Sequence, residues 1–342
     1  MFFASDNTGP VHPKVMEALA AANTGYASPY GNDDLTAEAV TKVREVFEAP
    51  DAMVHFVPTG TAANALLLAT LAKPWDAILC SDVAHVHVDE CNAPEFFAGG
   101  AKLVLVPSSG GKITATDLHE RIRSVAQGDV HCPQRGPVSI TQVTERGGVY
   151  TLDEIGAICD VAKSHNMPVH LDGARFANAV AALGCTPAEM SWKAGVDAVS
   201  FGGTKNGLMA VEAAILFDPD KSFEFELRRK RAAHLFSKLR YLSAQMLAYL
   251  TDDLWLEMAS EANRTGQKLA KALPDAGARL ADPADASLMY VEWDRQAEER
   301  LRETDAQFSS SEIEHDRFLA RLVTNWATTD DDVESFITAL KG

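Results

Sequence analysis

The chain has few cysteines, and they form no pattern that binds a metal or builds a disulfide framework. They lie at positions 80, 91, 132, 159 and 185, without a C-x-x-C pair and without a histidine at metal-ligand spacing. We therefore expect free thiols in a reducing cytoplasm and no bound metal. Nothing in the local sequence marks one of them as the nucleophile of a Cys/His hydrolase.

The sequence also lacks a long apolar run and an excess of basic residues. Its longest mainly apolar run covers 62–72, whereas a membrane span needs about 20 such residues. The start, Met1 to Asp6, has no basic segment followed by an apolar one, so we expect no signal peptide. The formal net charge of -17 would repel nucleic acid and anionic lipid, and Arg228 to Arg231 is the only basic run. We expect neither nucleic acid nor a membrane as partner.

What the sequence does contain is enough apolar residues for a large core. Its 342 residues are 46% hydrophobic and 23% charged, which is the size at which a core begins to divide. We expect a large domain over residues 1–250 and a small C-terminal domain over residues 251–342.

Segments typical of strands and helices alternate through the first two thirds of the chain. This order predicts a three-layer α/β fold, in which helices cover both faces of a mostly parallel sheet. The expected strands are 53–57, 77–80, 102–106, 138–143, 168–171, 198–201 and 213–217, and the expected helices between them are 61–71, 115–126 and 152–164. Thr151 and Glu154 form a capping-box signature for the last of these helices.

The pattern changes after residue 217. Residues 223–273 are expected to be helical, with breaks near Ser237 and Thr251. A small α+β unit follows, with antiparallel strands at 288–292 and 321–325 and a closing helix at 330–340 capped by Thr329.

Polar residues follow three of the expected strands, and ligands bind at such strand ends in parallel α/β sheets. Pro58 to Asn64 joins a glycine turn to a helix start, whose free amides suit a phosphate. Asp172 ends another strand, where it could ligate a metal, cap a helix or meet a cationic ring nitrogen. Lys205 lies in a glycine-rich turn after a third strand, which suggests a Schiff base or a phosphate contact.

The order of these three sites resembles the aspartate-aminotransferase-like fold type I of pyridoxal-phosphate enzymes. Within that group the chain resembles the threonine aldolase and β-eliminating lyase family. The resemblance rests on the segments 56–64, Ala84-His85, 170–175 and 321–324, and the opening Ser5-Asp6 and the Tyr30 to Asp33 loop fit as well. It implies pyridoxal 5'-phosphate as the cofactor and a homodimer or homotetramer whose active sites are shared between chains.

The resemblance also implies roles for individual residues. Lys205 would hold the cofactor as a Schiff base, and Asp172 would pair with its ring nitrogen. The amides of Gly60 and Thr61, with Thr204, would bind the phosphate. His85 would stack on the ring and serve as, or orient, a general base. Arg175, which belongs to the cofactor-site motif as well, would bind the substrate carboxylate together with Arg321 and Ser5.

Two departures from the family pattern leave roles open. The segment Gln142 to Gly148 has no histidine where many relatives have Asn-x-His-Asn, and Glu145 is a possible substitute of unknown role. The segment after Arg228 has His234, Lys238 and Arg240 in place of a glycine-rich turn. One of these could reach a phosphate, across a subunit interface or otherwise, and a solvated helix face is the alternative.

The resemblance implies retro-aldol cleavage of an L-β-hydroxy-α-amino acid, such as threonine, allo-threonine or phenylserine, to glycine and an aldehyde. One alternative is β-elimination, which would release pyruvate and ammonia. Another is a regulatory protein that binds pyridoxal phosphate or an amino acid without turnover. A dinucleotide-dependent dehydrogenase is not expected, because no G-x-G-x-x-G follows the first strand.

Overall fold

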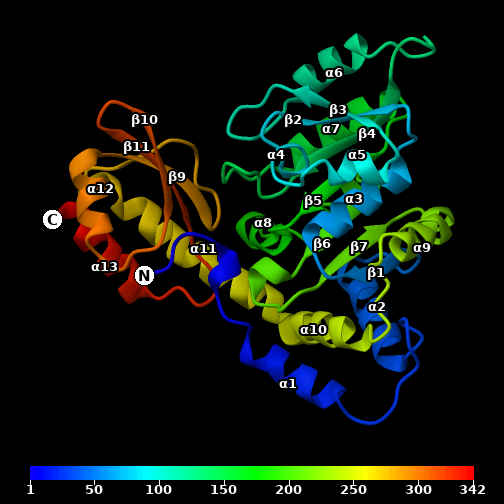
Figure 1. The fold of residues 1–342 in the computed structure, drawn as a ribbon, viewed down its shortest axis with the longest axis horizontal. Coiled ribbons are helices and arrows are strands. Elements are labelled where there is room, and N and C mark those ends of the chain that lie inside the picture. Colours follow the sequence, from blue (N-terminus) through cyan, green and yellow to red (C-terminus); the bar gives the residue numbers. More distant parts are fainter.

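The computed structural model describes all residues 1–342, and its larger part is built on a seven-stranded sheet (Figure 1). The strands are β1 (Met53–Val57), β2 (Asp76–Ser81), β3 (Lys102–Val106), β4 (Gln134–Thr141), β5 (Val169–Gly173), β6 (Ala198–Gly202) and β7 (Glu212–Leu216). Their order is β1-β7-β6-β5-β4-β2-β3. Only β7 runs antiparallel to its neighbours. The predicted mostly parallel sheet is therefore confirmed.

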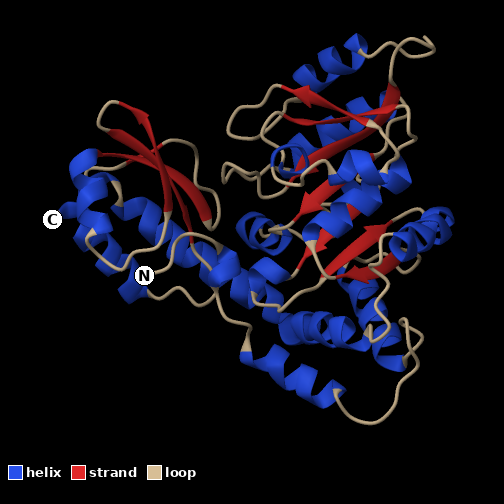
Figure 2. Cartoon of the chain, viewed as in Figure 1, coloured by secondary structure: helices blue, strands red, loops and turns tan.

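Helices cover both faces of this sheet (Figure 2). They are α1 (Pro13–Ala22), α2 (Asp34–Val46), α3 (Gly60–Leu71), α4 (His85–Val88), α5 (Ala93–Phe97), α6 (Ala115–Ser124), α7 (Leu152–Ser164), α8 (Phe176–Leu183), α9 (Ser222–Arg231) and α10 (Arg240–Leu250). The capping box predicted at Thr151 and Glu154 is present at the start of α7.

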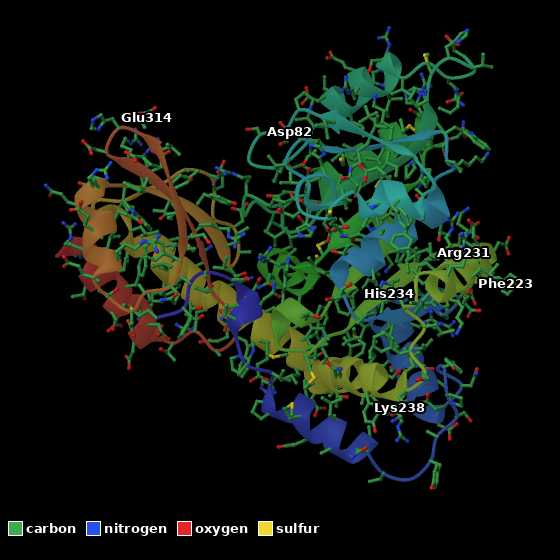
Figure 3. All side chains as sticks on the ribbon, in the orientation of Figure 1. Asp82, Phe223, Arg231, His234, Lys238 and Glu314 are labelled. Carbon is green, nitrogen blue, oxygen red and sulfur yellow. The ribbon has the colours of Figure 1, made fainter.

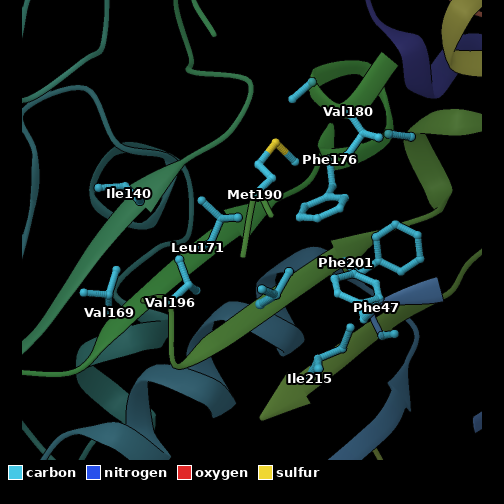
Figure 4. Packing of buried hydrophobic residues seen from close by; sticks show 14 of the residues in the cluster. Phe47, Ile140, Val169, Leu171, Phe176, Val180, Met190, Val196, Phe201 and Ile215 are labelled. Atoms are coloured by element: carbon cyan, nitrogen blue, oxygen red, sulfur yellow. The ribbon is translucent and has the colours of Figure 1, made fainter. Parts of the chain in front are cut away.

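Alternate residues of each strand pack into different apolar clusters, as the two-residue repeat of a strand requires. Val199 and Ile215 belong to a cluster of 49 buried residues, whose centre Figure 4 shows around Leu171, Phe176 and Phe201. The neighbouring residues of the same strands, such as Ala198, pack with α3 and α9 on the opposite face. Helix α3 is buried from Ala62 to Thr70 and so lies in the interior of the molecule.

The C-terminal part forms a four-stranded antiparallel sheet, β10-β11-β9-β8, with a cluster of 19 buried apolar residues. Its elements are α11 (Leu254–Ala272), β8 (Arg279–Leu280), β9 (Leu288–Asp294), α12 (Arg295–Arg302), β10 (Ser309–Glu314), β11 (Arg317–Val323) and α13 (Asp330–Lys341). The N-terminal residue Phe3 is part of the same cluster, and the N-terminus lies beside this sheet in Figure 1.

Helix α11 joins the two parts, because Trp255 packs into the large cluster and Leu269 into the small one. The helical segment breaks at 232–239 and again between α10 and α11. A domain boundary at residue 250 stays a prediction. None of the helices combines the length and apolar character needed to cross a membrane.

Candidate active site

A cavity of about 280 Å³ lies where the carboxyl ends of β1, β4, β5 and β6 meet. It is lined by all seven residues expected to hold the cofactor and by the residue of open role, Glu145. The seven are Gly60, Thr61, His85, Asp172, Arg175, Thr204 and Lys205. The parallel order of the strands explains this convergence, because it places the end of each strand at one edge of the sheet.

The start of α3 has the features of a phosphate site. Thr59 caps the helix by accepting a hydrogen bond from the amide of Ala62 at 3.2 Å. A Cβ atom added to Gly60 would meet nothing within 4 Å, so the space beside these first amides is open. The amino end of a helix with open space in front of it binds an anion.

Asp172 is a buried carboxylate whose two oxygens are held in place. One oxygen accepts a hydrogen bond from the Asn64 side chain at 2.8 Å, and the other accepts one from the amide of Ala174 at 3.0 Å. The side chain is 2% exposed. A fixed and buried carboxylate of this kind has the geometry to pair with a protonated ring nitrogen.

Asn64 links Asp172 to a second buried carboxylate. Its amide nitrogen also donates to Glu90 at 2.9 Å, and the same Glu90 oxygen lies 2.8 Å from Nδ1 of His85. The hydrogen bond to Glu90 raises the pKa of His85, while burial opposes that shift. His85 is therefore set in a network that favours its protonated form.

Lys205 lies on the turn Thr204–Asn206 that follows β6. The positive charge of Arg175 lowers the pKa of Lys205 most, burial lowers it further, and Asp6, Asp172 and Glu212 act in the opposite direction. A lysine with a lowered pKa is a better nucleophile at neutral pH, as Schiff-base formation requires.

The residues expected to bind the substrate carboxylate occupy different positions relative to the cavity. Arg175 lines the cavity and forms a two-pronged ion pair with Asp6, with nitrogen-oxygen distances of 2.6 and 3.2 Å. Arg321 donates to the carbonyl of Ala4 at 3.0 Å, and its buried Nε has no partner. Ser5 caps the turn 6–8, and the cavity is lined there by Asn7.

Tyr30 and Arg240 lie outside the cavity of their own chain. The Tyr30 side chain lies under the Lys230 ammonium group, 5.0 Å from the ring centre. Arg240 donates to the carbonyl of Gly25 at 3.4 Å and to the hydroxyl of Tyr241 at 3.3 Å. Neither of them contributes to the cavity formed by one chain.

The structure adds site residues to which the sequence assigned no role. Asn64 stands within the helix-start motif, one turn after Gly60, and this spacing is the one signal that pointed to it. Glu212, the first residue of β7, accepts the amide of Gly203 at 2.7 Å, and burial raises its pKa to about 7. Asn7, Glu90 and Thr141 complete the set.

Similarity to known proteins agrees with this geometry. The family model described as β-eliminating lyase matches residues 3–296. The low specificity L-threonine aldolase of Pseudomonas aeruginosa is 42% identical over 97% of this chain and 94% of its own. The structure of a Leishmania major threonine aldolase is 28% identical, with a TM-score of 0.93 over 99% of this chain and 98% of its own.

A more distant structure shares the fold alone. It is a serine palmitoyltransferase from S. paucimobilis with a bound PLP-myriocin aldimine, 17% identical, with a TM-score of 0.74 over 100% of this chain and 86% of its own.

Proposed function

Because the chain belongs to the β-eliminating lyase family, we propose that it is a pyridoxal-phosphate-dependent aldolase. Its substrates would be L-β-hydroxy-α-amino acids of the threonine, allo-threonine or phenylserine type, which it would cleave to glycine and an aldehyde. The observation that carries this proposal is that Lys205, Asp172 and the start of α3 line one cavity. An amine, a carboxylate and an anion site are the three contacts that a phosphorylated pyridine aldehyde needs.

Each contact has a defined role in the proposal. Lys205 would form the covalent link, Asp172 would keep the ring nitrogen protonated, and the amides of Gly60 and Thr61 would hold the phosphate with Thr204. When bound, pyridoxal phosphate supplies an electron sink for the bond that breaks at Cα. His85 would cover the ring from the α4 side.

The orientation of the substrate would decide which bond breaks. Arg175, held by Asp6, would bind the carboxylate together with Arg321 and Ser5. A carboxylate fixed in this way would set the orientation of the Cα substituents and so decide which bond the cofactor weakens.

The test is product analysis. Purified protein loaded with pyridoxal phosphate is expected to convert L-threonine or L-phenylserine to equal amounts of glycine and the matching aldehyde, measured by amino acid analysis and an aldehyde-reducing dehydrogenase. The Lys205→Ala variant is expected to remain folded and to form no glycine. Pyruvate and ammonia from serine, without aldehyde from threonine, would assign the chain to β-elimination instead. No turnover of any of these substrates would favour a binding protein.

We also propose a homodimer or homotetramer in the cytoplasm. Two observations support an oligomer. Tyr30 and Arg240 do not line the cavity of their own chain, so a role for them in a site requires a second chain. Two large apolar residues one turn apart on α9 are exposed to solvent, Phe223 with 69% and Leu227 with 51% of its surface. Figure 3 shows Phe223 at the outer edge of the molecule. Exposed apolar groups gathered on one helix face are typical of subunit contacts.

A further inference from the structure

Glu145 lies in the loop between β4 and α7 and lines the candidate active site. Side-chain bonds within the loop fix its course. The Gln142 side chain accepts a hydrogen bond from the amide of Tyr150 and donates one to its carbonyl. The Thr144 hydroxyl donates a hydrogen bond to the carbonyl of Gly110. Glu145 is therefore presented to the cavity from a rigid segment.

The two oxygens of Glu145 are used differently. Oε1 accepts the amide of His85 and the hydroxyl of Thr141, both at 2.8 Å. Oε2 is shielded from solvent and has no hydrogen-bond partner. A buried carboxylate oxygen without a partner is costly, so in a residue that lines a cavity it indicates a ligand group that completes it.

Three other titratable groups of the cavity, His85, Glu212 and Asp172, already have hydrogen-bond partners. Nδ1 of His85 is engaged with Glu90, and this hydrogen bond raises the pKa of His85. Glu212 accepts the amide of Gly203 beside Thr204, near the expected phosphate. Asp172 is held by Asn64 and Ala174. Among the carboxylates that line the cavity, Glu145 is the one whose buried oxygen lacks a partner; Glu90 also has such an oxygen but does not line the cavity.

We propose that Glu145 is the catalytic residue that accepts the β-hydroxyl proton of the substrate through its free oxygen Oε2. This inference rests on the proposed function, since it requires a substrate with a β-hydroxyl group. It assigns the general base to a carboxylate and leaves His85, bonded to Glu90, the role of contacting the cofactor ring.

The step balances in protons and electrons. The O-H bond breaks and its proton passes to Oε2, while the O-H electron pair becomes the second bond of the aldehyde carbonyl. The Cα-Cβ bond breaks and leaves its electron pair at Cα. Lys205, released from the cofactor when the substrate amine takes its place, would then give a proton to Cα. The proton held by Glu145 would return to Lys205 through water after the aldehyde leaves, and glycine would depart when Lys205 takes back its link to the cofactor.

The charges around Glu145 suit a group that gains and loses a proton near neutrality. Burial and, to a smaller extent, the negative charge of Asp172 raise the pKa of Glu145 to about 7, against the opposing hydrogen bonds from His85 and Thr141. Burial and the charge of Glu145 raise the pKa values of Cys80 and Tyr150, so both groups stay neutral. A base with a pKa near the working pH is the most effective one.

The experiment compares Glu145→Gln with the wild type, both loaded with pyridoxal phosphate. We expect kcat/KM for cleavage of L-phenylserine to fall about 10²- to 10⁴-fold, the usual contribution of a general base. Visible absorbance of the bound cofactor, glycine affinity and deuterium exchange at the glycine Cα should stay close to wild type, because glycine has no β-hydroxyl. The wild-type rise of kcat/KM with pH through about 7 should be absent from the variant.

Asp197→Asn is the matched control. Asp197 is another carboxylate with a raised pKa, and it accepts the amide of Val169 at the opposite end of β5 at 2.7 Å. This variant should cleave the substrate like the wild type. In Glu145→Ala, added formate should restore part of the cleavage by replacing the missing carboxylate, which a purely structural role would not allow.

Three results would overturn the inference. The first is that Glu145→Gln cleaves the substrate at the wild-type rate. The second is that this variant loses deuterium exchange of glycine to the same extent as cleavage. The third is that formate restores no cleavage in Glu145→Ala. If the wild type itself forms no aldehyde, the proposed function fails, and this outcome is distinct from a failure confined to the variants.

Discussion

At the scale of single residues, the site depends on Asn64, which holds two buried carboxylates apart. Its amide nitrogen donates to Asp172 and to Glu90, which are 108 and 26 positions away in the chain. Without this donor the two negative charges would face each other in a buried place, where such repulsion is poorly screened. The same network reaches His85 through Glu90 and so controls the charge opposite the cofactor position.

The Glu90→Gln substitution tests this network. Because the Glu90 hydrogen bond raises the pKa of His85, we expect that pKa to fall in the variant, as followed by NMR of the imidazole. A raised folded-state pKa contributes stability that is complete below the ordinary value of about 6.5 and disappears as pH rises through the folded value. The variant should therefore lose more stability near pH 6 than near pH 8. Exposed Asp89→Asn should change neither quantity, and an unaltered His85 titration in Glu90→Gln would disprove the coupling.

At the scale of elements, close packing between the strand ends sets the spacing of the site residues. A Cβ atom on Gly202, at the end of β6, would lie 2.5 Å from the carbonyl oxygen of Ala174. The carbonyl belongs to the backbone, so it cannot move aside without shifting the end of β5, which carries Asp172, or the turn that carries Lys205. Gly156 in α7 is the opposite case, since an added Cβ there meets nothing within 4 Å.

These two glycines give a matched pair of substitutions. Gly202→Ala should destabilise the protein by about 1–3 kcal/mol through overpacking, and it should weaken cofactor binding. Gly156→Ala should stabilise it by about 0.5–1 kcal/mol, because alanine loses less backbone entropy in a helix. Unfolding in urea measures both changes. Equal effects of the two substitutions would show that packing at the end of β6 is not tight.

Elements with a strong local pattern could be predicted from the sequence. Strands β1 and β3 and helix α7 have the expected bounds, because apolar runs and a capping box are local signals. Strand β10 was missed, since Ser309–Glu314 is polar and mostly exposed and pairs only with β11. Strand β4 ends at Thr141, two residues earlier than expected, because the following residues turn to present Glu145.

In the site, the residues at strand ends could be predicted from the sequence, whereas their distant partners could not. Gly60, Asp172 and Lys205 each follow an apolar strand, and parallel strands bring their ends together. Asn64, Glu90 and Glu212 act through contacts with residues far away in the chain, and no local pattern marks such partners. The free oxygen of Glu145 is likewise a property of the folded loop alone.

At the scale of the whole molecule, the exposed face of α9 should be covered by a second copy of the chain. Phe223→Asp combined with Leu227→Asp would place two charges in that contact, so we expect a smaller particle by light scattering. The control is Val130→Asp, since Val130 is 93% exposed on the α6-β4 loop, away from α9. An unchanged particle mass in the double variant would place the subunit contact elsewhere.

The most direct test of the account is to trap the bond between the protein and its cofactor. Protein loaded with pyridoxal phosphate should absorb visible light, lose this absorbance on reduction with borohydride, and give one peptide carrying the reduced cofactor on Lys205. An adduct on another lysine, or no chromophore after loading, would contradict the assignment of the cavity and the reaction proposed for it.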